Sequence, residues 1–167
     1  MRWSGLAARL IVGGVWVWAG VLKLPDPAAS VSAVRAYQLV PTGIVDTVGR
    51  VLPMLEVVVG VCLIVGLLTR FVGGLSALMQ LAFVIGIVSV WSRGIAINCG
   101  CFGDGGPDPD AFSKYPWEIA RDVGLMGLSL FLAFRPRTPY AVDTILFPEH
   151  SDPMTNTKQV EDVEAEA

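Results

Sequence analysis

The sequence predicts an all-α integral membrane protein: a bundle of four transmembrane helices, with a short interfacial helix between helices 1 and 2. Hydrophobic residues make up 53% of the 167 residues and charged residues only 16%, against roughly a quarter in ordinary soluble domains. The apolar residues collect in four runs of roughly 17 to 21 residues, each about long enough to cross the hydrocarbon core of a bilayer. The net charge of −3 comes with no basic stripe, which argues against nucleic acid as a partner.

The first run extends from Leu6 to Leu24. A basic start before a hydrophobic stretch is also typical of a signal peptide, but this run is long for one and no small-x-small cleavage site follows directly. A retained first helix is therefore expected. Its glycines, Gly13, Gly14 and Gly20, would let another helix approach closely.

A short interfacial helix is expected after the first run. The sequence Pro25-Asp26-Pro27 ends the first helix, because proline cannot continue the hydrogen-bond ladder and restricts the residue before it. The stretch from Ser30 to Val40 is mildly amphipathic, which places Arg35 and Tyr37 near the lipid headgroups. The turn Pro41-Thr42-Gly43 then leads to the second run.

Three further runs complete the predicted bundle. The second spans about Ile44 to Leu68, with its membrane-embedded part expected from near Leu52. The connection Thr69-Arg70 is very short, so the third run, Phe71 to Trp91, must be antiparallel to the second. The fourth run is Trp117 to Phe134. Together these runs predict one membrane domain, residues 1–147, and a C-terminal tail, residues 148–167, whose polar, acidic composition is typical of disorder.

The segment between the third and fourth runs carries the most distinctive residues: Ile97-Asn98-Cys99-Gly100-Cys101-Phe102-Gly103, followed by an acidic loop rich in glycine and proline. Two cysteines one residue apart can close only a small, strained ring, and strain makes a disulfide easier to reduce. Gly100 removes the Cβ that would hinder this tight turn. A loop position predicts an accessible pair. The pattern favours a dithiol–disulfide pair that exchanges electrons with a partner thiol over two merely structural cysteines.

Metal binding is disfavoured for this pair. Two thiolates need two more ligands to complete a zinc site, and the single histidine, His150, follows the fourth run on the opposite face. Cys62, in the second run, is expected to pack as a small hydrophobic side chain. A role as a resolving thiol is its alternative, if that part of the helix approaches the cysteine loop.

Glu56 is an ionisable group in or near the hydrocarbon, where charge is costly and often functional. Lys23 and Arg121 are its candidate partners. Arg121 shares one face of the fourth helix with Glu118 and Asp122, near the start of that helix. Two interpretations stay open: an ion network that fixes helix register, and a proton relay that serves thiol or quinone chemistry.

The expected location is the cell inner (cytoplasmic) membrane, crossed several times. Four spans put both termini on one face and the cysteine loop on the other. Lysine and arginine are almost equally distributed between the two faces, so the positive-inside rule does not orient the chain. A disulfide-forming pair persists on the oxidising side of a membrane, which predicts cytoplasmic termini and an extracytoplasmic cysteine loop.

Several short motifs occur in a familiar order over roughly residues 5 to 135: Arg9-x-x-x-Gly13, Ala19-Gly20-x-x-Lys23-Leu24, Tyr37-x-x-x-Pro41, Leu52-Pro53-x-Leu55-Glu56-x-x-x-Gly60, Cys99-Gly100-Cys101-Phe102-Gly103, and Trp117 with Arg121. In these motifs the chain resembles the DoxX-like superfamily of four-helix membrane proteins, and more closely its MauE (methylamine utilisation protein) branch. The cysteine segment between helices three and four is the most specific of them.

The resemblance implies a membrane component of thiol–disulfide or quinone-linked redox systems. MauE-like proteins are associated with maturation of the disulfide-rich methylamine dehydrogenase subunits and with thioredoxin-fold partners. The hypothesis is a thiol–disulfide oxidoreductase component in which Cys99 and Cys101 exchange electrons with an extracytoplasmic thioredoxin-like protein. A quinone would be the final acceptor, and Glu56 and Arg121 would position helices or move protons. The alternative is a non-catalytic membrane anchor or assembly subunit for a redox enzyme.

Overall fold

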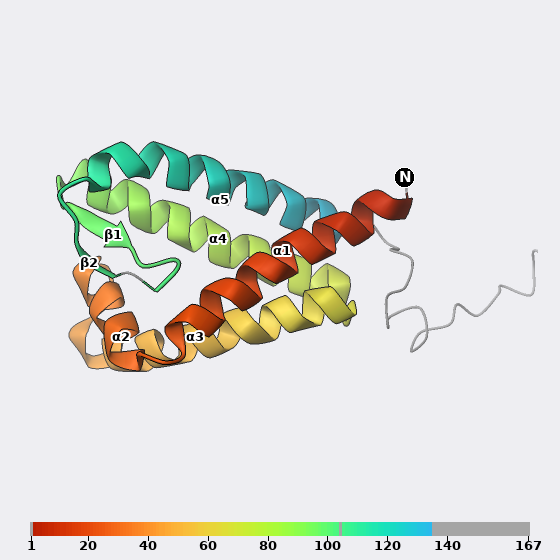
Figure 1. The fold of residues 1–167 in the computed structure, drawn as a ribbon, viewed down its shortest axis with the longest axis horizontal. Coiled ribbons are helices and arrows are strands. Elements are labelled where there is room, and N and C mark those ends of the chain that lie inside the picture. The colour runs from red at the N-terminus through yellow and green to blue at the C-terminus, as the bar shows by residue number, and fades with distance from the viewer. Residues whose placement is uncertain (1, 104, 135–167) are drawn as a thin grey trace, which may run out of the picture.

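Four long helices form a bundle that carries a small cap at one end (Figure 1). The computed structural model describes residues 2–103 and 105–134. The elements in these residues are α1 (Arg2–Lys23), α2 (Pro27–Ala36), α3 (Thr42–Val65), α4 (Thr69–Ser92), β1 (Ile97–Cys99), β2 (Gly105–Pro107) and α5 (Ala111–Phe134). Successive long helices run in opposite directions along the bundle. We call α2, the β1–β2 hairpin and their flanking turns the cap (residues 24–41, 93–103 and 105–110).

The short helix starts where the sequence places a helix break. Asp26 caps α2 by accepting a hydrogen bond from the Ala29 N–H at 2.9 Å, and Pro27 occupies the first helical position. Proline is well suited to that position because its missing N–H would be unpaired there anyway. The predicted helix from Ser30 to Val40 therefore exists, but it begins three residues earlier and ends at Ala36.

The last long helix also begins earlier than its apolar run indicates. α5 starts at Ala111, before the predicted Trp117, and it contains Pro116 in its second turn. The Ser113 side chain donates to the Asp110 carbonyl at 2.7 Å and supports this first turn. The opening turns carry polar residues, so hydropathy alone does not mark them. The predicted acidic tail, His150 and the domain boundary after residue 147 lie outside the described residues.

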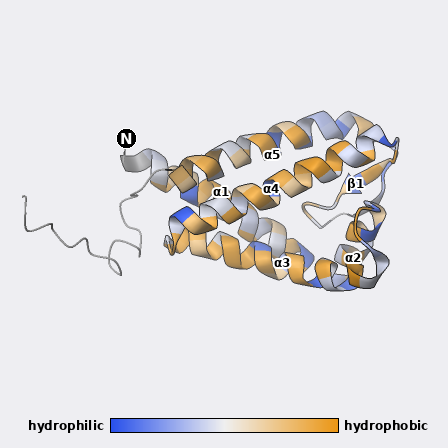
Figure 2. Ribbon diagram, turned by 180° about the vertical axis from the view of Figure 1, so that it is seen from behind, coloured by the Kyte–Doolittle hydropathy of each residue, from blue (hydrophilic) through white to orange (hydrophobic). Residues whose placement is uncertain are grey.

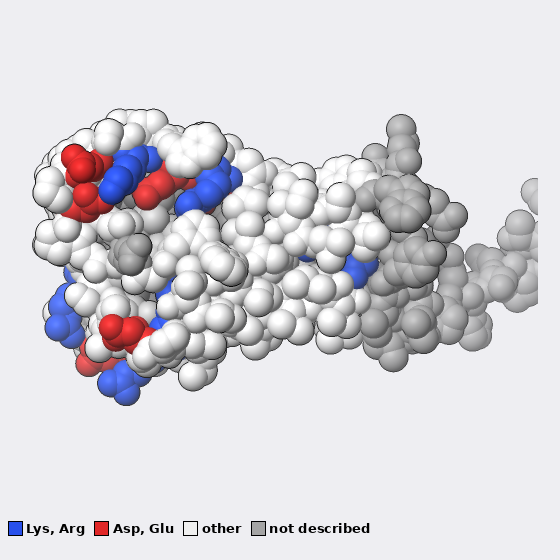
Figure 3. Space-filling view, in the orientation of Figure 1, with Lys and Arg blue, Asp and Glu red and all other residues white. Residues whose placement is uncertain are grey.

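The surface of the bundle suits contact with lipid. Among the described residues, three helical stretches are long and apolar enough to cross a membrane: Ser4–Lys23, Thr42–Val65 and Thr69–Ser92. Figure 2 shows the hydrophobic residues that run along these helices. On the face drawn in Figure 3, most charged side chains gather at the cap end. The surface over the middle of the bundle shows almost no charged side chains. α5 is not among the three stretches, so the predicted count of four spans is matched only in part.

Helices α1 and α3 touch through their backbones. A methyl group added at Gly13 would lie 2.7 Å from Ile64 Cγ1 and 2.8 Å from the Gly60 carbonyl oxygen. One at Gly20 would lie 2.6 Å from Val57 Cγ2, whereas one at Gly14 would meet nothing within 4 Å. The prediction of close helix approach is therefore confirmed for two of the three glycines. It also fixes which face of α1 lies against α3.

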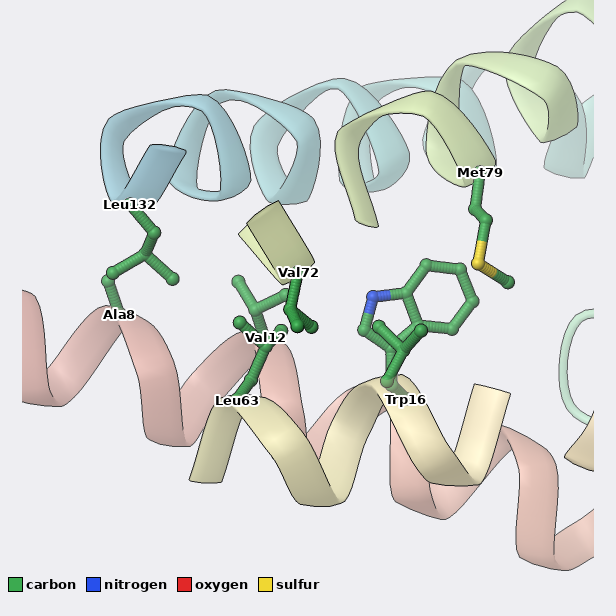
Figure 4. Close-up of a cluster of buried hydrophobic side chains, with 8 residues drawn as sticks. Ala8, Val12, Trp16, Leu63, Val72, Met79 and Leu132 are labelled. Carbon is green, nitrogen blue, oxygen red and sulfur yellow. The ribbon is translucent and has the colours of Figure 1, made fainter. Parts of the chain in front are cut away.

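A chain of hydrogen-bonded polar side chains crosses the apolar core. The apolar side chains of this core come from all four long helices and include Trp16 of α1 (Figure 4). The Trp16 indole N–H donates to Ser76 Oγ of α4 at 2.6 Å, and Ser76 lies 2.9 Å from Ser129 Oγ of α5. Gln80 Oε1 lies 3.0 Å from the same Ser129 hydroxyl. These bonds join three helices, because a buried polar group needs a partner.

Candidate functional site

The cysteine segment forms one edge of the hairpin. Strand β1 pairs antiparallel with β2, and Cys99 stands opposite Gly105. Gly100 follows with a φ of 67°, a left-handed conformation that glycine adopts without steric cost. This turn brings Cys101 back toward Cys99, with the Cys101 N–H 3.4 Å from Cys99 Sγ. The tight turn predicted for Gly100 is therefore present.

The two thiols differ in acidity. Both cysteines are free, and Cys101 donates to Cys99, which lowers the pKa of the Cys99 thiol because the hydrogen bond stabilises its anion. The same bond, together with burial, raises the pKa of Cys101 well above its usual range. Cys99 is thus the thiol that deprotonates first. Since the thiolate is the reactive form, Cys99 is the stronger nucleophile of the pair.

The predicted accessibility of the pair is wrong. Cys99 is 7% exposed and Cys101 is 8% exposed. The cap covers both: Ala33 of α2 packs directly on Gly105. A methyl group added at Gly100 would lie only 2.9 Å from the Cβ atom of the same alanine. A loop between two helices is usually solvated, but here another element of the cap lies over it.

Two tyrosines hold the hairpin in place. Tyr37, just after α2, donates its hydroxyl to the Cys99 carbonyl at 2.8 Å, and Arg93 donates to the Tyr37 carbonyl. Burial raises the pKa of Tyr37 far above its usual range, so this phenol keeps its proton. Tyr115 of α5 accepts a hydrogen bond from the Ile97 N–H at 3.1 Å and lies 2.8 Å from the Ile95 carbonyl oxygen. The backbone of β1 is thus fixed from both sides.

Glu56 pairs with Lys23 inside the bundle. The Lys23 ammonium lies 2.7 Å from Oε1 and 2.9 Å from Oε2 of Glu56. Neither side chain is exposed, and the pair links the end of α1 to the middle of α3. Of the two predicted partners of Glu56, the structure therefore shows Lys23 and not Arg121.

Arg121 pairs instead with its neighbour in sequence. Its Nε and one terminal nitrogen both lie 2.9 Å from Oδ1 of Asp122. The guanidinium also lies over the Phe102 ring, 4.7 Å from the centroid. Glu118, one turn before Asp122, lies close enough to the Cys99 thiol for its side chain to raise the pKa of that thiol, against the effect of Cys101. The charged face predicted for α5 therefore points at the cysteine segment.

Two cavities border the cysteine pair. The larger, of about 230 Å³, lies between α2, α3, α4 and the hairpin, and its lining includes Lys23, Tyr37, Phe83, Cys99 and Cys101. The smaller, of about 30 Å³, borders Cys101 and Phe102. Its polar lining residues are Glu56, Gln80, Cys101, Arg121 and Asp122. Cys101 therefore borders both an apolar cavity and a cluster of charged side chains.

Cys62 is remote from the pair. It lies near the end of α3 that is opposite the cap, and it packs against the apolar core. Gly49, which lines the larger cavity, precedes it by a length of helix of about 20 Å. The packing role predicted for Cys62 fits this position, and its alternative as a resolving thiol does not. Within residues 2–103 and 105–134, no cluster of histidine, cysteine and acidic side chains could hold a metal ion.

A match to a known protein family covers all of the described residues. The family model described as methylamine utilisation protein MauE matches residues 1–135. The chain belongs to the MauE family. No curated protein and no solved structure matches it. Membership of this family agrees with the apolar helices, since MauE is a membrane family.

In this MauE-family chain, sequence reasoning missed two parts of the site. Tyr37 was expected near the headgroups, yet its hydroxyl holds the Cys99 backbone. The motif Tyr37-x-x-x-Pro41 is the sequence signal that could have identified Tyr37 as a residue of the site. Glu118 and Asp122 were recognised as a charged face, but no sequence pattern shows that this face meets the thiols.

Proposed function

We propose that this protein is a membrane component of a thiol–disulfide redox system, in which Cys99 and Cys101 exchange electrons with an extracytoplasmic thioredoxin-like partner. The observation that carries the proposal is the asymmetry of the pair. The Cys99 sulfur accepts the Cys101 backbone N–H at 3.4 Å, which stabilises its thiolate and lowers its pKa, whereas the Cys101 thiol is directed at the Cys99 carbonyl oxygen, 4.0 Å away. Exchange through a mixed disulfide needs such a division between an attacking and a resolving thiol.

The proposed topology has four spans. α5 packs along α4: a methyl group at Gly73 of α4 would lie 3.1 Å from the Ser129 carbonyl oxygen of α5. If α4 crosses the membrane, α5 returns beside it. Its acids, Glu118 and Asp122, are buried in the bundle and do not face lipid. Both termini then lie in the cytoplasm of an inner-membrane protein, with α2 at the outer interface and the cap in the oxidising compartment.

A quinone fits the larger cavity as final electron acceptor. An engineered apolar cavity of about 150 Å³ admits benzene, so a cavity of about 230 Å³ beside both thiols has room for a single-ring head group. Val48, Leu52, Ala82 and Phe83 would hold it, and they belong to helices apolar enough to face lipid. A quinone takes up two electrons and two protons, which matches oxidation of one dithiol.

Burial of the pair favours a second candidate function. A protein partner can reach Cys99 only if α2 moves away, because Ala33 and Tyr37 cover the hairpin. If the cap stays closed, the cysteines are structural and the protein is a membrane anchor or assembly subunit for a redox enzyme. In that case, the redox enzyme that this protein helps to assemble would still mature after both cysteines are replaced by serine.

Thiol trapping in native membranes distinguishes the exchange function from the anchor or assembly function. Cys101→Ser should accumulate a mixed disulfide between Cys99 and a partner protein, because the resolving thiol is gone. Cys99→Ser should accumulate less mixed disulfide, because burial raises the pKa of the remaining Cys101 thiol. Cys62→Ser is the matched control and should trap nothing. The exchange function is wrong if neither Cys101→Ser nor Cys99→Ser forms a mixed disulfide with any protein.

A further inference from the structure

We propose that Asp122 and Glu118 form a proton path for the resolving thiol, with Asp122 accepting the proton of Cys101. The inference rests on the proposed exchange function and assigns roles to two residues of α5. It also changes the roles considered for Glu56 and Arg121.

Two buried carboxyl oxygens carry this inference. Asp122 Oδ2 and Glu118 Oε2 are buried, and no described residue offers either of them a hydrogen-bond partner. The two side chains are only 5% and 9% exposed. Leaving such an atom unpaired costs free energy, and two such atoms occur here, one helical turn apart. A buried oxygen without a partner is free to take up a proton.

Glu56 is not suited to the same task. Both of its carboxyl oxygens accept hydrogen bonds from the Lys23 ammonium. Neither oxygen of Glu56 is therefore left without a partner, in contrast to Oδ2 of Asp122. Of the two roles considered for Glu56, fixing the helices therefore fits the geometry better than moving protons.

Arg121 acts as a positioning residue for Asp122. Two of its three guanidinium nitrogens bind Oδ1, which leaves Oδ2 of the same carboxylate unengaged. Its stacking on Phe102 ties this pair to the cysteine segment. The guanidinium thus fixes the carboxylate without occupying the oxygen that would take the proton.

The path leads from the buried thiol toward the cap surface. Cys101 and Asp122 line the same small cavity of about 30 Å³. Glu118 lies one turn nearer the start of α5, and its side chain interacts with the Cys99 thiol. The helix begins in the cap beside Lys114, whose side chain is half exposed. A proton taken from Cys101 by Asp122 can pass to Glu118 and then to solvent.

The chemistry balances for oxidation of the pair by a partner disulfide, which is the direction that a disulfide probe tests. With a quinone as final acceptor the same steps run in reverse, and Asp122 returns the proton to Cys101. The Cys99 thiolate attacks one partner sulfur, the partner S–S bond breaks, and the first partner thiolate leaves and gains a proton. Cys101 loses its proton to Asp122, and its sulfur attacks Cys99 Sγ. The mixed S–S bond breaks, the Cys99–Cys101 bond forms, and the second partner thiol leaves with a proton. The pair loses two electrons and the partner disulfide gains two.

The pH dependence of the second step tests for a base. The groups that face Asp122 come from every neighbouring element: Lys23 of α1, Glu56 of α3, the uncharged Gln80 of α4, Cys101 of the hairpin, and Glu118 and Arg121 of α5. With Asp122 in place, the resolution rate should be nearly flat between about pH 6 and 8. Without it, hydroxide must deprotonate Cys101, and the rate should rise about tenfold per pH unit.

The experiment uses glutathione disulfide as the probe and the full chain in lipid, with Cys62→Ala to remove the spare thiol. Glutathione is attached to Cys99, and its release by Cys101 is followed by mass spectrometry. Asp122→Asn should slow release about 100-fold at neutral pH and make it pH-dependent. Asp122→Glu should restore the flat profile. Asp46→Asn, an exposed acid of α3 paired with Arg35, is the control and should leave the rate unchanged.

A folded Asp122→Asn chain that releases glutathione at the unaltered rate overturns the proton path but leaves the exchange function standing. If Asp122→Asn does not accumulate in the membrane, Glu118→Gln replaces it, because it keeps the Arg121–Asp122 pair. It should slow release about tenfold, and an unchanged rate again overturns the path. Failure of the unaltered chain to react with glutathione disulfide would contradict both proposals.

Discussion

The Tyr37 hydroxyl donates a 2.8 Å hydrogen bond to the carbonyl of Cys99, across 62 positions of sequence. This bond ties the segment after α2 to the backbone of the cysteine pair. Because Ala33 of the same helix packs on the hairpin glycines, the position of α2 decides whether the thiols can be reached.

Replacing Tyr37 by phenylalanine should loosen this cover. The Cys99 carbonyl would lose its side-chain donor, at a cost of about 1 kcal/mol, while the apolar packing of the ring stays. We expect faster labelling of Cys99 by a small maleimide, measured by mass spectrometry. Trp117→Phe, at a residue that is 73% exposed, is the control and should label at the unaltered rate. Equal rates in both variants would show that the bond does not restrain the cap.

The acidity of Cys99 should depend on the Cys101 thiol. The Cys101 side chain lowers the pKa of Cys99 by donating to its sulfur, so the Cys99 thiolate persists to lower pH than an ordinary thiolate. In a Cys62→Ala chain, alkylation at limiting reagent should modify Cys99 first. Cys101→Ala should shift the midpoint of Cys99 alkylation to higher pH, because the donor is lost. A midpoint that stays in place, or initial modification of Cys101, would contradict this assignment.

The buried ion pair should contribute strongly to stability. Glu56→Gln leaves the Lys23 ammonium buried without its counter-charge, which costs about 3–5 kcal/mol. The double change Lys23→Met and Glu56→Leu removes both charges and should recover most of this loss. The free energy of unfolding in lipid or mild detergent is the measurement. A double variant that is no more stable than Glu56→Gln would show that the charges do not act as a pair.

The contact between α1 and α3 should tolerate no side chain at Gly60. A methyl group there would lie 2.7 Å from the Gly13 carbonyl oxygen, so Gly60→Ala should force the helices apart and destabilise the bundle by about 1–3 kcal/mol. Gly14→Ala is the matched control, because its methyl group meets nothing within 4 Å. Thermal unfolding of the two variants should differ, and identical midpoints would rule out tight packing at Gly60.

The long helices could be predicted because their signal is local. Runs of apolar residues of membrane-spanning length gave α1, α3 and α4 with ends within a few residues of the observed ones. The start of α5 could not be read in the same way, because its first turns are polar and contain Pro116. The motif order was enough to suggest the family that the match over residues 1–135 then showed.

The site was harder to predict because it is assembled from distant segments. The cysteine pair and its tight turn follow from three consecutive residues, Cys99, Gly100 and Cys101. Their burial does not, since it depends on Ala33 in a helix more than sixty residues earlier. The choice of Lys23 over Arg121 as the partner of Glu56 likewise required the relative rotation of three helices.

The pairing of Lys23 with Glu56 has a consequence for biogenesis. A ribosome synthesises Lys23 well before Glu56, which follows it by 33 residues. While α1 is the only helix in the bilayer, its terminal ammonium must remain in the headgroup layer, because no counter-charge exists yet. Only after α3 has inserted can this ammonium leave water, because Glu56 then supplies its counter-charge. Membrane insertion of α3 is thus a condition for burying the Lys23 end of α1.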